Sequence, residues 1–101
     1  MFEFTGFQRD SLYTIAGLDG AHRLGIKNEI ETVYEIEINP SRLYPNLDTL
    51  VRKGLVEKGT IDDRTNSYDI TEQGKQLIAS RREWEDELLS EESTHKNTTE
   101  A

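Results

Sequence analysis

Residues 39–54 constrain the fold most, because they specify a helix together with both of its ends. Asn39 can accept hydrogen bonds from first-turn amides, and Pro40 stands at the first helical position, where a missing N–H costs nothing. Gly54 can adopt the left-handed conformation that ends a helix. Spacing by helical turns predicts one buried stripe, made of Leu43, Leu47, Leu50 and Val51.

The other faces of this predicted helix carry hydrogen-bonding groups, namely Ser41, Arg42, Tyr44, Asn46, Asp48 and Thr49. An arginine and an asparagine on an exposed helix suit the reading of base edges in a DNA major groove. Pro45 departs from the pattern, because inside a helix it removes a backbone hydrogen bond, and we expect it to bend or loosen the first turn.

The chain is 101 residues long, which is enough for one small domain whose core gains from burial against a partner. It contains no cysteine, which excludes disulfides and thiolate metal sites. His22 and His95 have no partners at ligand spacing, so we expect no metal and no cofactor. Neither a signal peptide nor a membrane-spanning run is visible, and we therefore expect a cytoplasmic protein.

The formal net charge of -8 is unusual for a protein that binds nucleic acid. The acids concentrate after residue 60, however, whereas residues 39–54 hold Arg42, Arg52 and Lys53 against Asp48. An acidic surface with more arginine than lysine fits a protein that works in very high salt, where long-range fields are screened. An ordinary acidic surface that aids solubility is the alternative, and composition does not decide between them.

The rest of the chain predicts elements on both sides of this helix. Thr5 and Gln8 have capping-box spacing and open a helix to about Leu18, with an apolar face of Phe7, Leu12, Tyr13, Ile15, Ala16 and Leu18. A second helix spans about residues 21–34, with Leu24, Ile26, Ile30 and Val33 facing inward and His22 as a capping or phosphate-facing group. Residues 35–38 alternate polar and apolar, which predicts a short strand.

Residues 55–61 and 67–70 predict a hairpin with its turn at 62–66, and Thr71 caps a last helix that ends near Leu89. The resulting fold class is α+β, mainly α: a winged helix-turn-helix with a C-terminal dimerisation helix. We expect residues 1–70 to form the DNA-binding domain, 71–89 the dimerisation helix, and the polar stretch 90–101 a disordered tail.

Three blocks of sequence resemble PadR-like transcriptional regulators. The first is Arg42-Leu43-Tyr44-Pro45-Asn46-Leu47 with residues 50–56, which is similar to the recognition helix of that family. The second, residues 64–74, resembles its wing and the exit from it. The third, residues 7–17, looks like the version found in salt-loving archaea. The resemblance covers roughly residues 5–89.

The resemblance implies a dimeric regulator that binds a palindromic operator. Longer family members carry a larger C-terminal domain, so the single C-terminal helix here argues against a dedicated pocket for a small-molecule effector. The candidate DNA-binding residues are Asn39, Ser41, Arg42, Tyr44, Asn46, Lys27, Lys53, Arg64, Thr65 and Asn66.

These candidates differ in what they are expected to contact. Arg42 and Asn46 suit guanine and adenine, Ser41 and Tyr44 suit phosphate, and the wing residues suit phosphate or a minor groove. Each has a structural alternative: Arg42 and Asn46 can merely solvate an exposed face, Tyr44 can pack under the wing, and residues 64–66 can serve only as turn residues.

The last helix carries a heptad-like seam, which predicts the dimer interface. We expect the interface to comprise Phe4, Phe7, Leu77, Ile78, Arg81, Trp84 and Leu88, with Trp84 as its anchor. The alternative is that the same seam packs on the first helix of its own chain.

Together these features predict a homodimeric, sequence-specific transcriptional regulator on a pseudo-palindromic operator. The helix at about 40–53 would enter the major groove, and the wing at 55–70 would reach backbone or minor groove. The alternative is a winged helix whose acidic surface binds a basic partner protein and which binds no DNA. No nucleophile–base pair or phosphate loop is present, so we do not expect an enzyme.

Overall fold

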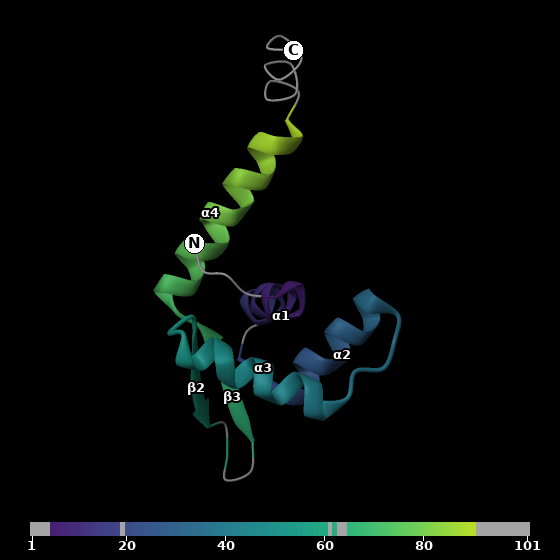
Figure 1. Cartoon of the computed structure of the whole chain (residues 1–101). Coiled ribbons are helices and arrows are strands. Elements are labelled where there is room, and N and C mark those ends of the chain that lie inside the picture. The colour runs from purple at the N-terminus through teal and green to yellow at the C-terminus, as the bar shows by residue number, and fades with distance from the viewer. Residues whose placement is uncertain (1–4, 19, 61, 63–64, 91–101) are drawn as a thin grey trace.

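The computed structural model of the chain describes residues 5–18, 20–60, 62 and 65–90 (Figure 1). In chain order its elements are α1 (Gly6–Gly17), β1 (Ala21–His22), α2 (Arg23–Tyr34), α3 (Pro40–Arg52), β2 (Val56–Thr60), β3 (Asn66–Ile70) and α4 (Glu72–Leu89). The mainly helical winged helix-turn-helix predicted from the sequence is confirmed, with β2 and β3 forming the wing.

The helices begin where their capping residues predict. Thr5 and Gln8 form a complete capping box, in which each side chain accepts a hydrogen bond from the backbone N–H of the other residue. Asn39 caps α3, and Thr71 caps α4 by accepting from the N–H of Gly74. His22 is also a cap, since its Nδ1 accepts from the N–H of Gly25 at 3.1 Å. α3 continues unbroken through Pro45.

The sheet is antiparallel, with β3 between β1 and β2. Its third strand is Ala21–His22, a segment that was predicted to start a helix. A short strand was predicted at residues 35–38, where the structure has none. That prediction was wrong. Glu35 instead ends α2 in the left-handed conformation, with φ of 60°. The N–H of Ile38 then donates to the Glu31 carboxylate at 2.7 Å, so a side chain satisfies the amide that a neighbouring strand would otherwise pair.

One hydrophobic core lies between the helices and the sheet. Its side chains are Phe7, Leu12, Ile15, Ala21, Ile26, Ile30, Ile38, Leu43, Leu47, Leu50, Leu55, Val56, Tyr68 and Leu77. α2 contributes Ile26 and Ile30, one turn apart. The prediction that Leu24 and Val33 also face inward was wrong, because they are 58% and 69% exposed. Ala16, placed on the apolar face of the first helix, is exposed as well.

Two glycines shape the passage from α3 into α4. Gly54 has φ of +77°, the left-handed turn that its position after α3 predicts. Gly74 lies in the first turn of α4, and a Cβ there would stand 2.3 Å from the carbonyl oxygen of Leu55. Its missing side chain therefore lets α4 start directly against the segment that leads into β2.

α4 leaves the body and projects away from it (Figure 1). Its first two turns contribute Gly74 and Leu77 to the interior, whereas its later turns carry exposed apolar side chains. Within the described ranges, no helix combines the length and apolar character needed to cross a bilayer.

Candidate nucleic-acid interface

One side of α3 is buried in the core, and the other side faces outward. Leu43, Leu47 and Leu50 are fully buried, and this stripe fixes the rotation of the helix on the body. At its N-terminus the Asn39 Oδ1 accepts hydrogen bonds from both the N–H and the Oγ of Ser41, each at 2.9 Å. Asn39 and Ser41 are thus committed to each other in the cap, although both remain exposed.

The most outward stripe of α3 consists of Ser41, Pro45 and Arg52, which are four and seven residues apart and all exposed. Arg52 donates through Nη2 to Thr49 Oγ1 at 2.9 Å, and Thr49 in turn donates to the carbonyl of Pro45 at 3.0 Å. Arg52 is not among the DNA-binding candidates predicted from the sequence. Its spacing from Ser41 and Pro45 is the signal that would have found it.

Arg42 and Asn46 lie on the edge of α3 next to α1. The Arg42 guanidinium is 4.1 Å from the centroid of the Phe7 ring. Asn46 donates to the Arg42 carbonyl at 2.7 Å and accepts from Gln8 Nε2 at 2.9 Å. One N–H and one lone pair of the Asn46 amide remain for a further partner.

Tyr44 lies on the opposite edge and packs partly against the core. The Arg23 guanidinium stands 4.4 Å from the centroid of its ring and donates through Nε to the Tyr68 hydroxyl at 2.9 Å. Arg23 was not a candidate in the sequence analysis. No local signal marks it, because its partners are 21 and 45 residues away in the chain.

The wing borders the same side of the molecule. Thr65 and Asn66 are partly exposed, and the N–H of Thr65 donates to Asp62 Oδ1 at 2.9 Å, an Asx-type contact that shapes the turn. Asn66 begins β3 opposite Thr60. Arg64, the wing candidate with the charge, lies outside the described residues.

The two lysine candidates have different surroundings. Lys27 Nζ is 2.9 Å from Glu31 Oε2, and both side chains are about three-quarters covered. Hydrogen bonds from the Ile38 amide and from Lys27 hold the pKa of Glu31 below its ordinary value, so this carboxylate stays ionised at neutral pH. Lys27 therefore helps to hold the loop between α2 and α3 through its contact with Glu31. Lys53 stands partly exposed at the C-terminal end of α3.

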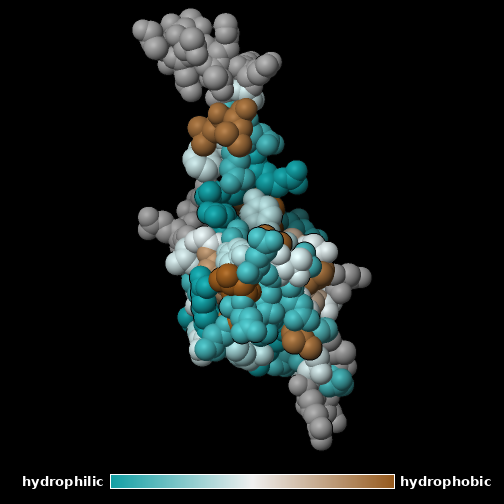
Figure 2. All heavy atoms as spheres, turned by 90° about the vertical axis from the view of Figure 1, so that its right-hand side faces the viewer, coloured by the Kyte–Doolittle hydropathy of each residue, from teal (hydrophilic) through white to brown (hydrophobic). Residues whose placement is uncertain are grey.

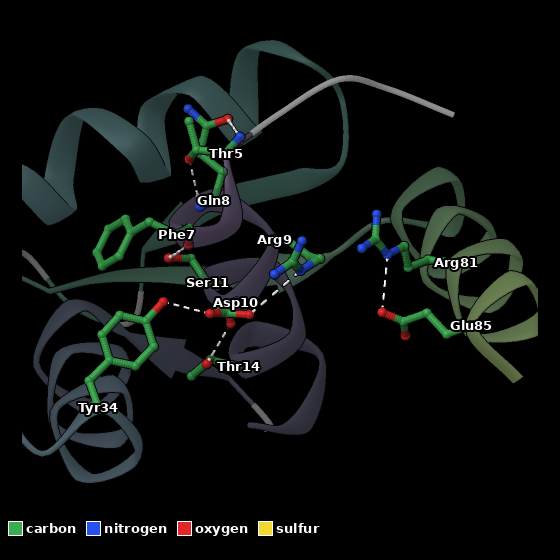
Figure 3. Close-up of polar contacts among 10 residues, drawn as sticks. All are labelled: Thr5, Phe7, Gln8, Arg9, Asp10, Ser11, Thr14, Tyr34, Arg81 and Glu85. Atoms are coloured by element: carbon green, nitrogen blue, oxygen red, sulfur yellow. Dashed lines mark hydrogen bonds and ion pairs between the residues drawn. The ribbon is translucent and has the colours of Figure 1, made fainter. Parts of the chain in front are cut away.

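A polar contact of Asp10 connects α1 with Tyr34 at the end of α2 (Figure 3). The Tyr34 hydroxyl donates to Asp10 Oδ2 at 2.5 Å, and Arg9 lies 3.7 Å from the other oxygen of the same carboxylate. Burial is the main cause that raises the pKa of Tyr34, so this hydroxyl keeps its proton and remains a donor. α1 is thus fixed between α2 and α3, with Phe7 packed edge-on against Tyr34.

The predicted dimer residues divide into two groups. Phe7 and Leu77 are 7% and 8% exposed and belong to the core of their own chain, and Ile78 packs against that core. Trp84 and Leu88 are 45% and 49% exposed farther along α4, and Arg81 stacks on the Trp84 ring at 4.9 Å and bonds Glu85 at 3.3 Å.

Exposed apolar surface continues past the predicted seam. Leu89, which is not among the predicted interface residues, is 84% exposed. Apolar side chains show in brown at the far end of α4, well away from the body (Figure 2). Phe4 lies outside the described residues. Among the described residues, no group of three or more histidine, aspartate or glutamate side chains could hold a metal ion.

A helix-turn-helix followed by a two-stranded wing defines this molecule as a winged-helix protein of the nucleic-acid-binding type. The chain matches the family model described as "Transcriptional regulator PadR-like family" over residues 12–80. It belongs to the PadR-like family of transcriptional regulators, and is thus a DNA-binding regulator and not an enzyme.

Solved structures agree with this assignment. RosR of H. salinarum, in crystals grown from NaBr, is 39% identical, with a TM-score of 0.83 over 97% of this chain and 88% of that one. A structure described as the complex hsRosR-S4 is 39% identical, with a TM-score of 0.84 over 97% and 84%. The Streptococcus mutans protein smu.1704 shares the fold at 19% identity, with a TM-score of 0.65 over 95% and 94%. The comparison with curated proteins gives no match.

Proposed function

We propose that this protein is a homodimeric, sequence-specific transcriptional regulator that inserts α3 of each protomer into a major groove. The observation that carries the proposal is the outward side of α3, where Ser41, Arg42 and Arg52 are exposed while the leucines beneath them are fully buried. A rigid helix that presents donors of this kind suits recognition of base edges and phosphates.

The roles of the side chains follow from their places on α3. Arg42 is the guanine-reading candidate, because an arginine can donate two hydrogen bonds to guanine O6 and N7. Asn46 is the adenine-reading candidate and would exchange its contact with Gln8 for one with the base. Ser41 and Arg52 suit phosphates. The wing, through Thr65, Asn66 and Arg64, would reach backbone or minor groove.

The net charge of -8 does not oppose this arrangement. At an ionic strength of 1 M the Debye length is roughly 3 Å, so distant carboxylates repel DNA little while contacting cations still act. Since α3 and the segment after it carry Arg42, Arg52 and Lys53 against Asp48, the local charge at the interface is positive.

We propose that α4 pairs the protomers through Trp84, Leu88 and Leu89, with Arg81 beside them. These apolar side chains are between 45% and 84% exposed on one projecting helix, a surface that a second copy would cover. Phe7 and Leu77 have almost no surface left to offer and are not part of this interface. A two-fold axis would then place two recognition helices on half-sites that are one or more helical turns apart, about 34 Å per turn.

The test is the binding of the purified protein to its own promoter DNA in high potassium chloride, by fluorescence anisotropy with a scrambled competitor. We expect a preference for the promoter that survives high salt. Equal binding to both duplexes would contradict sequence reading. No binding at any salt concentration would contradict the proposal as a whole and favour a winged helix that binds a partner protein.

A further inference from the structure

Arg23 borders α3 on the edge that faces away from Arg42. It is the first residue of α2, and its guanidinium carbon lies 4.4 Å from the centroid of the Tyr44 ring. Since Tyr44 and Arg42 are two residues apart on α3, their side chains leave the helix in widely different directions. The two arginines thus flank the outward stripe of Ser41, Pro45 and Arg52 on its opposite sides.

The scaffold holds the Arg23 side chain in place. Its Nε donates to the hydroxyl of Tyr68 at 2.9 Å, and Tyr68 is fully buried in the middle strand of the sheet. Ala21, two residues before Arg23, is paired with Tyr68 across β1 and β3. The backbone and the side chain of this segment are therefore fixed to the same residue. Binding a ligand would thus cost little further conformational entropy at Arg23.

Within the described part of the chain, the remaining donors of Arg23 are not used. A guanidinium has five N–H groups, of which Tyr68 takes the one on Nε. Among the described residues, none accepts from Nη1 or Nη2, and no carboxylate forms an ion pair with Arg23. Lys27, on the same helix, is paired with Glu31. The Arg23 side chain is partly exposed, so its outer end is open to a ligand from outside.

The charge of Arg23 is secure. The hydrogen bond from Arg23 to Tyr68 is the largest cause that raises the pKa of the arginine, and Asp48 acts in the same direction. A planar, permanently charged donor with two free amino groups matches the oxygens of a phosphodiester.

We propose that Arg23 is a phosphate-binding residue of the DNA interface, held between Tyr44 and Tyr68 so that it contacts the backbone on the wing side of α3. The inference rests on the proposed function. A major groove about 12 Å wide is nearly filled by a helix roughly 10–12 Å across, so a cation at the edge of the helix meets the sugar–phosphate wall and not the base edges.

A purely structural role for Arg23 makes different predictions. As a clamp between α2, α3 and β3, it would act through its Nε bond and its stacking, which Arg23→Lys removes while the charge is kept. As a phosphate contact it acts through charge, which Arg23→Gln removes. Tyr68→Phe deletes the hydroxyl that positions Arg23 and leaves the charge in place.

The experiment measures affinity for the promoter duplex and for a scrambled duplex over a range of salt concentrations. We expect Arg23→Gln to weaken binding to both duplexes by the same factor, roughly tenfold, and to change the slope of log K against log salt by about one relative to the wild type. Arg23→Lys and Tyr68→Phe should keep the wild-type slope. Arg82→Gln, the same substitution at an exposed site on α4, is the matched control and should change neither quantity.

An unchanged slope in a folded Arg23→Gln protein, or equal losses in Arg23→Gln and Arg23→Lys, would overturn the inference. If Arg23→Gln does not fold, as judged by circular dichroism, Arg23→Met replaces it, because its apolar stem can still cover Tyr44. Failure of the proposed function is recognised separately, since the wild type would then show no preference for the promoter.

Discussion

At the residue scale, the proposed guanine contact of Arg42 would compete with its contact to the Phe7 ring for one guanidinium. In the free protein it covers the Phe7 ring at 4.1 Å, a contact worth about 0.5–1 kcal/mol where the cation is exposed. A bidentate bond to guanine discriminates by about 1–3 kcal/mol. Because the bond to guanine is the stronger of the two, Arg42 can leave Phe7 on binding.

We therefore predict that Arg42→Ala weakens binding to the specific duplex by about 1–3 kcal/mol and relaxes the preference at one base pair. Anisotropy titrations against a panel of singly substituted duplexes measure both effects. Because the change also uncovers Phe7, the thermal unfolding of the variant is compared with that of the wild type. The same loss on every duplex would identify Arg42 as a phosphate contact instead.

Glu31 makes the loop between α2 and α3 sensitive to acid. Its carboxylate accepts from the Ile38 amide and from Lys27, which lowers its pKa below the ordinary value of 4.5. A group with a lowered folded-state pKa stabilises the fold fully above its unfolded pKa, and this contribution is lost as the pH falls through the folded-state pKa.

We predict that Glu31→Gln is less stable than the wild type at neutral pH, and that the difference shrinks as the pH falls below about 4.5. Urea unfolding at a series of pH values measures the difference. Glu29→Gln removes an exposed carboxylate from the same helix and serves as the control. A difference that stays constant from neutral to acid pH would show that the Glu31 charge has no part in holding the loop.

At the element scale, what could be predicted depends on how local the determining contacts are. The starts of α1, α3 and α4 depend on side chains two or three residues from the amides they cap, and these were predicted correctly. Residues 35–38 alternate between polar and apolar as a strand does. The Ile38 amide, however, donates to the side chain of Glu31, which lies outside these four residues. β1 has two residues, too few for any periodic signal.

The candidate site shows the same division. Arg42 could be singled out because it lies on a helix whose rotation the leucine stripe fixes. Arg23 could not, because its position is set by Tyr44 and Tyr68, whose contacts with it exist only once the sheet and the helices have assembled. Likewise, Phe7 was predicted on the apolar face of the first helix and in the dimer interface, and its burial in the core of its own chain follows only from the assembled helices.

The junction between the wing and α4 gives a prediction about packing. Gly74→Ala gains about 1 kcal/mol of helix propensity, but its Cβ would meet the Leu55 carbonyl oxygen at 2.3 Å and Ile70 Cγ1 at 2.7 Å. A backbone oxygen cannot rotate away as a side chain can, so the clash outweighs the gain. We expect a net destabilisation of about 1–3 kcal/mol in urea unfolding.

Gly17→Ala is the matched control, because Gly17 also lies in a helix and a Cβ there meets nothing within 4 Å. We expect it to leave stability unchanged or slightly raised. If Gly74→Ala proved as stable as Gly17→Ala, the close approach of α4 to the Leu55 segment would not contribute to the fold.

At the scale of the whole molecule, the exposed apolar side chains of the projecting α4 are unusual for a protein that stays monomeric. Its first turns complete the core, whereas its later turns carry the exposed apolar side chains of Trp84, Leu88 and Leu89. Apolar side chains gathered on a helix that leaves the body mark an association surface. A second α4 would cover them and would fix the separation of the two recognition helices.

We predict that Leu88→Glu converts a dimer to a monomer, because it places a charge in the middle of this apolar surface. Size-exclusion chromatography with light scattering measures the mass, and circular dichroism verifies that the monomer keeps its helices. Gln76→Glu adds the same charge at an exposed position near the start of α4, away from Trp84 and Leu88, and should remain dimeric. If Leu88→Glu keeps the dimer mass, the protomers pair through another surface. If it becomes monomeric yet binds the promoter as tightly as the wild type, the two recognition helices do not act together on one operator.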